Sequence, residues 1–468
     1  MPFYSELNTA MSLRAAARKI YRAALDAVDP EAAVRRCVRR DGDSVRVGRR
    51  RYAGRRYRRV HVLGAGKAAA AMARGLERAL GPRLQGGLVV VKYGHSEPLR
   101  RVRVLEAGHP EPDANGLAGA RALMEYAAGM GPEDLVFFLL SGGASALLPL
   151  PAPGISPADK VALSALLLRC GASIQEMNTV RKHVSQIKGG QLARRLGAAA
   201  VVSLILSDVV GDDLSSIGSG PTVPDPTTYA DSLAVLRRYG LTGQVSEAVR
   251  RHLEAGAGGA VPETPKPGDP CFAGKHPLII GSNVLACRAA AAEARRQGYK
   301  PLILSSSVVG DTRAAAALHV AIAGDALTYG HPRRPPACLI SGGETTIRVT
   351  GDGRGGRNQE FVLSAVPALG RLPAPVLLVS LGTDGTDGPT DAAGAWADNR
   401  TAARAAVLGL PPVEEFLDRN DSYHFFQPLG DLIKTGPTRT NVMDLRFFLL
   451  GEPGMKIKRQ KAKGKNQK

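Results

Sequence analysis

Arg59-Val-His-Val-Leu-Gly64-Ala-Gly66-Lys67-Ala-Ala69 is the stretch that decides the fold. An apolar strand runs into a Gly-x-Gly-x-x-Ala turn, and a segment rich in alanine follows as a helix candidate. Glycines in such a turn let the backbone approach an anion at the start of the helix. The stretch therefore predicts a strand–turn–helix unit of an α/β domain, with Gly64 and Gly66 as candidate anion-binding residues.

The charges near this turn favour phosphate or carboxylate over a dinucleotide. A nicotinamide-binding unit uses an Asp or Glu at the end of the next strand, roughly twenty residues further on. The next apolar run, Gly86–Val91, is instead followed by Lys92, and the turn itself carries Lys67. Lys67 is therefore a candidate anion ligand, and an exposed lysine of a first helical turn is the alternative.

Outward from this unit, short apolar runs alternate with helical stretches rich in Ala and Leu. Runs that are apolar throughout are typical of parallel strands covered on both faces. We therefore predict an α/β protein with parallel sheets. The runs are Val60–Leu63, Gly87–Val91, Leu135–Leu140, Val201–Leu206, Leu278–Ile280, Leu302–Leu304, Cys338–Ile340 and Val376–Leu381.

The length of 468 residues exceeds one ordinary hydrophobic core, so two domains are expected. Ala255–Pro277 is rich in Gly and Pro, and residues 329–336 repeat that character, which indicates a junction between 255 and 335. The predicted parts are an N-terminal domain over 1–265, with later segments free to pack back on it, a C-terminal domain over 330–450, and a basic disordered tail over 451–468.

The formal net charge of +20 raises the question of nucleic-acid binding. Eight arginines fall in residues 46–59 and seven Lys or Arg in 454–468, so the rest of the chain carries only +5. Charge blocks are usually solvated, and 5% aromatic residues are too few for base stacking to be the main activity. Nucleic-acid binding is not expected, although weak attraction to polyanions stays open.

The cysteines indicate the redox compartment, and the longest uncharged run bears on membrane association. The five cysteines are scattered without a CxxC pair, which argues against a disulfide framework or a zinc site and favours a reducing cytoplasm. The uncharged run Leu135–Ala158 contains four prolines and a Ser-Gly-Gly turn, so we interpret it as a buried strand and loop. No signal-peptide pattern begins the chain, and we predict a cytoplasmic protein without membrane association.

Two strands end in the same polar turn. Leu139–Gly143 reads LLSGG and Leu339–Gly343 reads LISGG. Ligands of open α/β sheets bind at the carboxyl ends of strands, and backbone N–H groups of such turns can bind anions. Strand-to-helix turns also favour Ser and Gly without a ligand. The candidate residues are Ser141, Gly142, Gly143, Ser341, Gly342 and Gly343.

Asp208 and Arg357 are the candidates for acid–base and anion chemistry. Asp208 follows a buried apolar run and could act as a general base toward a hydroxyl, or cap the next turn. Arg357 and Asn358 end the glycine-dense loop 351–356, where the guanidinium could bind phosphate or carboxylate bidentately. A glycine-rich hairpin without a ligand is the alternative for that loop.

Asp384, Asp387 and Asp391 fall within eight residues and are separated by glycines. Mg²⁺ prefers carboxylate oxygens, and the candidate metal ligands are Glu344, Asp384 and Asp387. The spacing is not that of an EF-hand loop, so a plain acidic turn is the alternative.

The absent motifs narrow the chemistry. The chain has no G-x-x-x-x-G-K-[ST] loop, no protein-kinase motif set and no G-x-S-x-G nucleophile elbow. An acid, a lysine, an arginine and several anion-binding turns therefore favour phosphoryl transfer on another scaffold over acyl transfer.

Several long motifs follow one another in a fixed order over about residues 8–450. The N-terminal motifs are Gly64–Lys67, Glu106–Asp113, Leu140–Ala146, Met177–His183 with Lys188–Gly190, and Leu206–Asp212 with Gly218–Thr222. The C-terminal motifs are Ser341–Thr345, Gly355–Glu360, Gly382–Asp391, Asn420–Ser422 and Thr435–Asn441. In these segments the chain resembles the class II glycerate kinases with their leucine-rich C-terminal domain.

The resemblance implies a larger Rossmann-like N-terminal domain, a smaller mixed α/β domain, and an active site in the cleft between them. It implies transfer of the γ-phosphoryl group of ATP to the 2-hydroxyl of D-glycerate, with Mg²⁺ or another divalent cation. The family's functional residues fall on Lys67, Asp208 and Arg357. We expect Asp208 to accept the hydroxyl proton, and Lys67 and Arg357 to neutralise the carboxylate and the phosphoryl oxygens.

Two other activities stay open. An NAD(P)-dependent reductase of hydroxypyruvate, the keto relative of glycerate, is motivated by Gly64–Ala69 and opposed by the missing acid after the second strand. A non-catalytic binder of sugar phosphates or carboxylates is the second alternative. ATP and D-glycerate are the expected partners, and the oligomeric state stays open, with a homodimer as one candidate.

Overall fold

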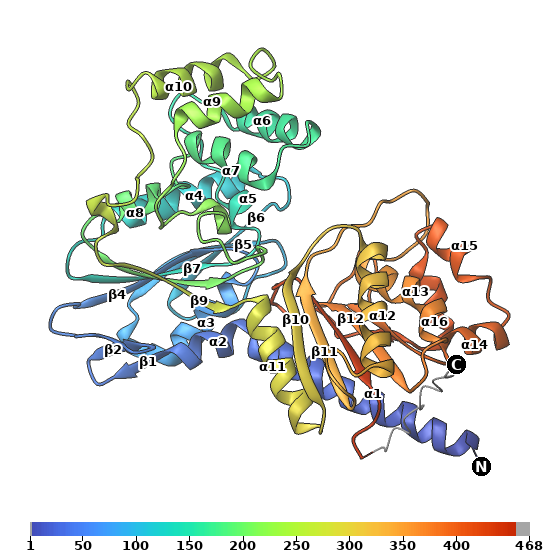
Figure 1. Ribbon diagram of the computed structural model, residues 1–468. Helices are drawn as coiled ribbons and strands as arrows, with labels where there is room; N and C mark the ends of the chain where they lie inside the picture. Colours follow the sequence, from blue (N-terminus) through green and yellow to red (C-terminus); the bar gives the residue numbers. More distant parts are fainter. Residues whose placement is uncertain (1, 455–468) are drawn as a thin grey trace, which may run out of the picture. The chain divides into compact units, whose positions relative to one another are not determined.

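The computed structural model describes residues 2–454, so most of the expected basic tail lies outside the described residues. The chain divides into two compact units (Figure 1). The Rossmann unit comprises 26–282 and 439–442, and the mixed-sheet unit comprises the described residues within 1–25, 283–438 and 443–468.

The Rossmann unit is built on a six-stranded sheet in which every neighbouring pair is parallel. The spatial order is β6-β5-β4-β7-β8-β9, which is 3-2-1-4-5-6 in chain order and confirms the Rossmann-like expectation. The strand order reverses between β4 and β7, where such sheets bind ligands. The strands are β4 (Arg59–Ala65), β5 (Gly86–Lys92), β6 (Val102–Ala107), β7 (Asp134–Leu140), β8 (Ala200–Leu206) and β9 (Lys275–Gly281).

Both faces of this sheet are covered, which explains why its central strands are apolar throughout. Alternate residues of β7 point to opposite faces: Phe137 joins a core with α2 and α3, whereas Phe138 joins a core with α4, α5 and α8. The helices are α2 (Pro30–Cys37), α3 (Ala69–Leu80), α4 (Ala114–Ala128), α5 (Ala144–Leu147) and α8 (Gln191–Arg195), with 3-10 turns η1 (Gly81–Arg83), η2 (Ile217–Ser219) and η3 (Pro270–Phe272).

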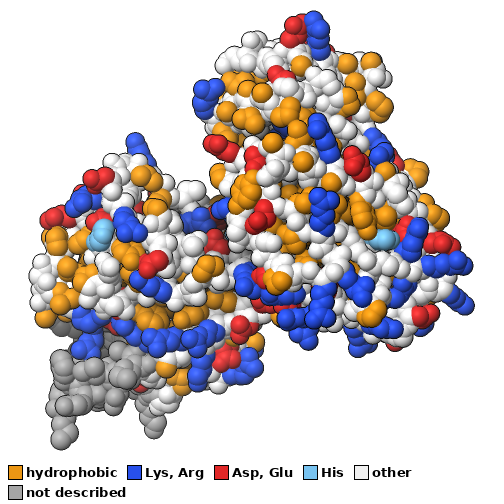
Figure 2. Space-filling model, turned by 180° about the vertical axis from the view of Figure 1, so that it is seen from behind, with side chains coloured by type: hydrophobic (Ala, Val, Ile, Leu, Met, Phe, Trp, Pro, Cys, Tyr) orange, Lys and Arg blue, Asp and Glu red, His pale blue; other side chains and the backbone are white. Residues whose placement is uncertain are grey.

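Part of the arginine-rich segment 46–59 lies in a small antiparallel sheet of the Rossmann unit. Its strands are β1 (Val38–Asp41), β2 (Ser44–Val47) and β3 (Arg50–Tyr52). Val45, Val47 and Tyr52 are buried against the main core, whereas seven of the eight arginines are exposed. Lys and Arg side chains gather along the lower edge of this unit (Figure 2), so the segment is a solvated basic surface.

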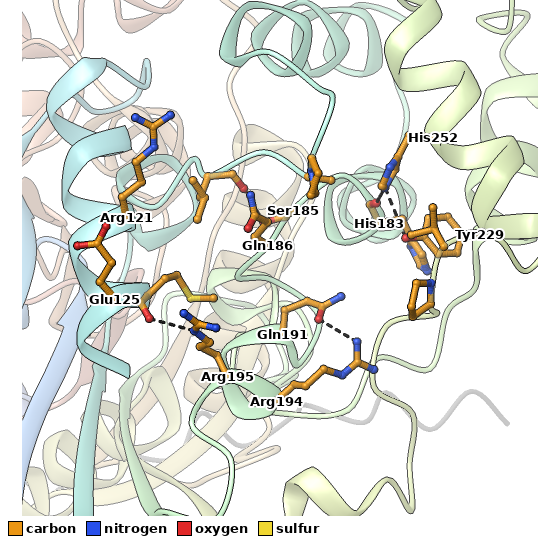
Figure 3. A pocket seen from close by; sticks show the side chains of 16 residues that line it. Arg121, Glu125, His183, Ser185, Gln186, Gln191, Arg194, Arg195, Tyr229 and His252 are labelled. Carbon is orange, nitrogen blue, oxygen red and sulfur yellow. Dashed lines mark hydrogen bonds between the residues drawn. The ribbon is translucent and has the colours of Figure 1, made fainter. Parts of the chain in front are cut away.

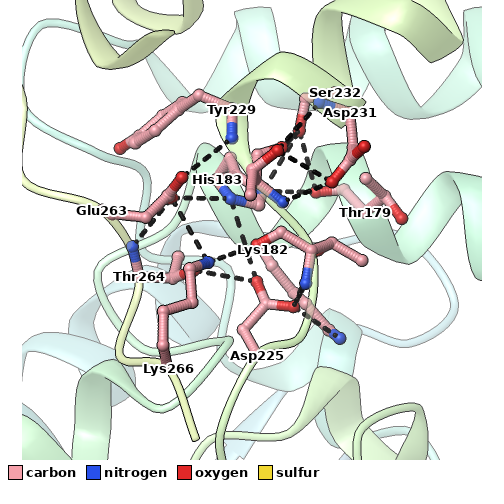
Figure 4. A network of polar contacts seen from close by, with 12 residues as sticks. Thr179, Lys182, His183, Asp225, Tyr229, Asp231, Ser232, Glu263, Thr264 and Lys266 are labelled. Atoms are coloured by element: carbon pink, nitrogen blue, oxygen red, sulfur yellow. Dashed lines mark hydrogen bonds and ion pairs between the residues drawn. The ribbon is translucent and has the colours of Figure 1, made fainter. Parts of the chain in front are cut away.

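A helical layer with its own apolar core completes the Rossmann unit. Its helices are α6 (Pro157–Arg169), α7 (Ile174–His183), α9 (Tyr229–Arg238) and α10 (Glu247–Ala257). Buried His183 links this layer to the following loops (Figure 4): its Nε2 lies 3.0 Å from Glu263 Oε1, and its Nδ1 lies 2.7 Å from the Thr179 carbonyl oxygen. Lys182 donates to Asp225 at 3.2 Å, so this polar network fixes the end of α7.

The mixed-sheet unit contains a second six-stranded sheet, ordered β10-β11-β15-β12-β13-β14. Only β10 and β11 are parallel; the last strand of the unit, β15, lies antiparallel between β11 and β12. The strands are β10 (Lys300–Val308), β11 (Ala337–Gly343), β12 (Val376–Gly382), β13 (Gly394–Asp398), β14 (Leu432–Ile433) and β15 (Asp444–Leu450). This sheet confirms the expected smaller, mixed α/β architecture.

Helices accompany this sheet in the mixed-sheet unit, and α13 contributes most of its residues to the buried core. They are α11 (Asn283–Arg296), α12 (Thr312–Thr328), α13 (Arg357–Leu369), α14 (Thr401–Val407), α15 (Val413–Asp418) and α16 (Ser422–Leu429), while the long α1 (Pro2–Ala27) begins the chain. Among the helices of the described residues, none is both long and apolar enough to span a bilayer.

Candidate active site

Lys67, Ser141 and Asp208 follow the neighbouring strands β4, β7 and β8 at the same edge of the Rossmann sheet. Ser141 Oγ accepts a hydrogen bond from the Ala68 backbone N–H at 3.0 Å, and the Lys67 N–H donates to the Gly142 carbonyl oxygen at 2.9 Å. These bonds join the two turns at the point where the strand order reverses. The structure therefore brings together three of the candidates that the sequence analysis singled out.

Close backbone approach explains the glycines of this edge. A Cβ on Gly66, whose φ is +129°, would lie 2.2 Å from Ser141 Oγ. A Cβ on Gly142 would lie 2.2 Å from Asp208 Oδ2, so the Asp208 carboxylate rests directly on the Gly142 backbone. Gly64 is similarly close to Leu139, where a Cβ would lie 2.6 Å from the carbonyl oxygen. The glycines thus set the position of Asp208 and of the Lys67 turn.

Two histidines belong to this site although no role was predicted for them. His95 Nδ1 lies 3.1 Å from the Lys67 carbonyl oxygen, and His109 lies so close to Gly143 that a Cβ there would be 2.9 Å from its ring. Burial and then the positive charges of Lys67 and Lys92 lower the pKa of His109 to about 4. His109 is therefore a neutral imidazole at neutral pH. Its only signal in the sequence was its place in the motif Glu106–Asp113.

We call Lys67, His95, His109, Ser141–Gly143 and Asp208 the strand-end cluster. It combines one carboxylate with a lysine that has no ion pair among the residues whose structure is described. A carboxylate beside a cation and backbone N–H groups can accept a proton from a hydroxyl while the cation stabilises negative charge. These functional groups are the ones that transfer of a phosphoryl group to an alcohol requires.

Arg357 lies in a second cluster, in the mixed-sheet unit. Its Nε donates to buried Asp444 at 2.8 Å and its NH1 lies 2.8 Å from Glu344 Oε1. Asn358 Nδ2 and Arg446 also donate to Asp444, at 2.8 and 2.6 Å. Burial opposes the charge of Arg357, but the Asp444 and Glu344 carboxylates outweigh it and keep its pKa above the ordinary value. We call these five residues the Arg357 cluster.

Asp444 and Arg446 were not predicted as site residues. Arg446 is fully buried, stacks over the Phe361 ring at 5.0 Å, and keeps two of its nitrogens, Nε and NH1, without a hydrogen-bond partner. Both residues come from β15, whose central place in the sheet depends on pairing with distant strands. No local motif could have marked them.

The Ser341–Gly343 turn has a packing explanation. Ser341 Oγ lies 2.9 Å from His319 Nε2, and a Cβ on Gly342 would lie 1.7 Å from Asn283 Oδ1. Gly343 has a φ of +129°, and a Cβ there would lie 2.2 Å from the Val308 carbonyl oxygen. The two glycines are therefore required by their neighbours whether or not an anion binds to this turn.

The three candidate metal ligands are used differently. Asp387 is buried, and its two oxygens accept from the backbone N–H groups and the side-chain amides of Asn358 and Gln359. These four donors occupy the lone pairs of the carboxylate. Asp387 therefore caps the N-terminus of α13 by accepting from the N–H groups of its first turn. Glu344 pairs with Arg357, and Asp384 Oδ1 accepts from the Thr386 N–H at 3.1 Å. Within residues 2–454, no group of three or more His, Cys, Asp or Glu could hold a metal.

A pocket of about 770 Å³ lies elsewhere in the Rossmann unit (Figure 3). Arg121 and Glu125 of α4 lie on one side of it, where Arg195 of α8 donates to the Met124 carbonyl oxygen at 3.2 Å, and His252 lies on the far side. None of the sequence-predicted site residues lines this pocket. Concavity alone therefore does not identify the site here.

Family models match both parts of the chain. A model described as a domain of unknown function (DUF4147) matches residues 16–254, and a model of the MOFRL family matches residues 337–444.

Individual relatives match nearly the whole chain. It is 42% identical over 434 residues to a glycerate 2-kinase of Pyrococcus horikoshii, covering 92% of this chain and 96% of that one. It is 42% identical to a protein of Agrobacterium vitis provisionally named a hydroxypyruvate reductase, covering 94% and 95%. The solved structure of a glycerate kinase from Thermotoga maritima superposes with a TM-score of 0.84 at 40% identity, covering 94% and 100%.

Proposed function

The chain belongs to the glycerate kinase family, and from that premise we propose that it transfers the γ-phosphoryl group of ATP to the 2-hydroxyl of D-glycerate. The products are 2-phosphoglycerate and ADP. The observation that carries the proposal is the Asp208 carboxylate held against Gly142 beside the Lys67 turn, at the switch point of a Rossmann sheet.

In the proposed reaction Asp208 accepts the proton of the 2-hydroxyl while the hydroxyl oxygen bonds to the γ-phosphorus of ATP. The bond from that phosphorus to the bridging β-phosphate oxygen breaks, and ADP leaves with this oxygen. Lys67 and Arg357 neutralise the carboxylate of glycerate and the oxygens of the transferring group. Phosphoryl transfer is mainly a matter of positioning and charge stabilisation. His109 is neutral, so it can donate a hydrogen bond to an anion without adding a second full charge beside Lys67.

Mg²⁺ is the proposed cofactor, and the carboxylates of Glu344 and Asp384 are donors that fit it. In enzymes that act on ATP, Mg²⁺ takes one or two protein carboxylates, and waters and phosphate oxygens complete its shell. Glu344 and Asp384, both partly exposed, would supply those carboxylates. When bound, Mg²⁺ neutralises charge on the phosphate oxygens.

Reduction of hydroxypyruvate is the second candidate, favoured by the name of the Agrobacterium vitis relative. It is opposed by Lys92, which ends β5 where a dinucleotide-binding sheet has an acid for the ribose. Oxidation of NADH or NADPH with hydroxypyruvate distinguishes it from the kinase. We expect no oxidation above background.

The direct assay is ADP release in the presence of Mg²⁺ and ATP, with and without D-glycerate. We expect release to depend on glycerate and to be nearly abolished in Asp208→Asn. ADP release at the same rate with and without D-glycerate would contradict the proposal. We also propose a cytoplasmic location, supported by five cysteines that are all unpaired thiols in the described structure, and a homodimer remains a proposal for sizing experiments.

A further inference from the structure

The loop between β6 and α4 carries His109 and is held by hydrogen bonds at both of its ends. At its start, the Ala107 carbonyl oxygen accepts from the Tyr93 backbone N–H at 3.2 Å. At its end, Asp113 Oδ1 accepts from the Gly116 backbone N–H of α4 at 2.8 Å, and its Oδ2 accepts from the Tyr93 hydroxyl at 2.6 Å. The loop therefore presents the His109 ring in a defined place at the carboxyl edge of the Rossmann sheet.

The His109 ring lies against one of two consecutive glycines, and the Asp208 carboxylate lies against the other. A Cβ on Gly143 would be 2.9 Å from His109 Cδ2 and 3.0 Å from its Nε2. A Cβ on Gly142 would be 2.2 Å from Asp208 Oδ2. Because consecutive Cα atoms are only about 3.8 Å apart, the Nε2 edge of the imidazole and the carboxylate flank adjacent positions of one turn.

Lys67 lies against the same glycine as His109, since its Cγ would be 3.5 Å from the Gly143 Cβ. In the part of the chain that the structure describes, neither side chain forms an ion pair with a carboxylate. Burial and then the charges of Lys67 and Lys92 lower the pKa of His109 to about 4, so the ring is neutral at neutral pH. A neutral imidazole beside an unpaired ammonium accommodates an anion better than a cation.

The covalent structure of glycerate indicates which anion lies at this position. Its carboxylate and its 2-hydroxyl are bonded to the same carbon, so a 2-hydroxyl in contact with Asp208 brings the carboxylate to the neighbouring side chains. An ammonium attracts an anion without fixing its orientation, whereas an imidazole N–H donates along one direction. Of the two side chains at Gly143, His109 is therefore the one that can orient a carboxylate.

We propose that His109 recognises the carboxylate of the acceptor by donating a hydrogen bond from Nε2 to a carboxylate oxygen, a role that rests on the proposed function. Lys67 supplies positive charge beside it, and His109 sets the orientation that brings the 2-hydroxyl to Asp208. A carboxylate next to Nε2 also selects the tautomer that carries its proton on this nitrogen. The enzyme then selects 2-hydroxy acids over alcohols that lack the carboxylate.

Steady-state kinetics of His109→Ala test this role. The KM for D-glycerate is expected to rise about 10- to 100-fold, as for the loss of a hydrogen bond to a charged group, while the KM for ATP stays unchanged. In His109→Gln the side-chain amide can donate in place of Nε2, so this variant is expected to recover part of the loss. His331→Ala, which removes an exposed histidine that also precedes a proline, is the matched control with wild-type constants.

Competition by two analogues of D-glycerate supplies a readout that a purely structural role would not move. D-lactate has the carboxylate and the 2-hydroxyl but no 3-hydroxyl, and glycerol has the hydroxyls but no carboxylate. In His109→Ala the inhibition constant of D-lactate should rise by the same factor as the KM for D-glycerate, and that of glycerol should not change. His109→Leu, which fills the space without a donor, carries the test if His109→Ala does not fold.

A raised KM for D-glycerate with an unchanged inhibition constant of D-lactate would assign His109 to the 3-hydroxyl and overturn the proposed role. Wild-type constants for glycerate in His109→Ala, or a raised KM for ATP alone, would overturn it as well. A wild-type protein that forms no phosphoglycerate would instead overturn the proposed function, so the two failures are distinguishable.

Discussion

The strand-end cluster and the Arg357 cluster both contain candidate reaction residues, but they are built in opposite ways. In the strand-end cluster, Lys67 has no ion pair among the described residues, and the positions are set by glycines and backbone hydrogen bonds. In the Arg357 cluster, Arg357 and Arg446 are paired with the carboxylates of Glu344 and buried Asp444. The charge of Lys67 is available to a ligand, whereas Arg357 also stabilises the fold through its carboxylate partners. Substitutions in the first should change activity alone, and substitutions in the second should change stability too.

Asp208→Asn is expected to give the largest effect. Loss of a general base costs roughly 10²- to 10⁴-fold in rate, so kcat should fall by about that factor. The thermal unfolding midpoint should stay near that of the wild type, because the amide fits the space beside Gly142. Rapid assays of ADP release together with thermal unfolding measure both. Near-full turnover would remove Asp208 from the role of base.

Lys67→Met should lower kcat by roughly 10²- to 10³-fold, as removal of one charge-stabilising group does in other enzymes. Because no ion pair is lost among the described residues, stability should change little. Lys67→Arg is the control that retains the charge. If Lys67→Met lowered the stability of the protein substantially as well as kcat, the contrast between the two clusters would be contradicted.

Asp444→Asn tests the other side of the comparison. It leaves fully buried Arg446 without its carboxylate, and breaking a buried pair by removing one partner costs about 3–5 kcal/mol. The free energy of unfolding, measured by denaturant titration, should fall by that order. Exposed Asp352→Asn in the same unit is a matched control. Unchanged stability would mean that Asp444 serves the reaction and not the fold.

Gly142→Ala should reduce turnover by about one order of magnitude, because its Cβ would lie 2.2 Å from Asp208 Oδ2 and displace the carboxylate. Gly243→Ala, a turn position outside the left-handed region where a Cβ meets no atom within 4 Å, controls for the loss of a glycine. Wild-type turnover in Gly142→Ala would show that the position of Asp208 is not set by this contact.

The smallest effect concerns pH. The pKa of His109 is lowered from 6.5 to about 4 in the folded protein, so the unfolded chain binds the proton more tightly. Folding stability is therefore lost as pH falls from about 6.5 toward 4. His109→Gln removes this term, and its unfolding midpoint should fall less than that of the wild type between pH 7 and pH 4.5. Equal pH dependence in the two proteins would contradict the buried, neutral imidazole.

Local patterns in the sequence were enough to predict the strand-end cluster in part. The strand, the glycine turn and Lys67 are contiguous in the sequence, and Asp208 directly follows an apolar strand. Lys67 and Asp208 could therefore be predicted without knowledge of the strand order. His95 and His109 could not, because they reach Lys67 only when β5 and β6 take their places in the sheet.

The Arg357 cluster was less predictable for a physical reason. Its centre, Asp444, begins strand β15, where it pairs with Gly343 of β11 and Gly382 of β12, 101 and 62 residues earlier in the chain, and no local sequence period encodes such pairing. The glycine-rich loop before Arg357 indicated an anion site, but not that a carboxylate of the same chain already holds the guanidinium. The acidic run at Asp384–Asp391 indicated metal binding, whereas Asp387 caps α13.

Phosphorus NMR of the product formed from ATP, Mg²⁺ and D-glycerate tests the central claim most directly, because it reads the acceptor oxygen. The account predicts the resonance of 2-phosphoglycerate, appearing with ADP in equal amounts and absent with Asp208→Asn. A 3-phosphoglycerate resonance would contradict the assignment of Asp208 to the 2-hydroxyl, and ADP without any phosphorylated acceptor would contradict the kinase itself.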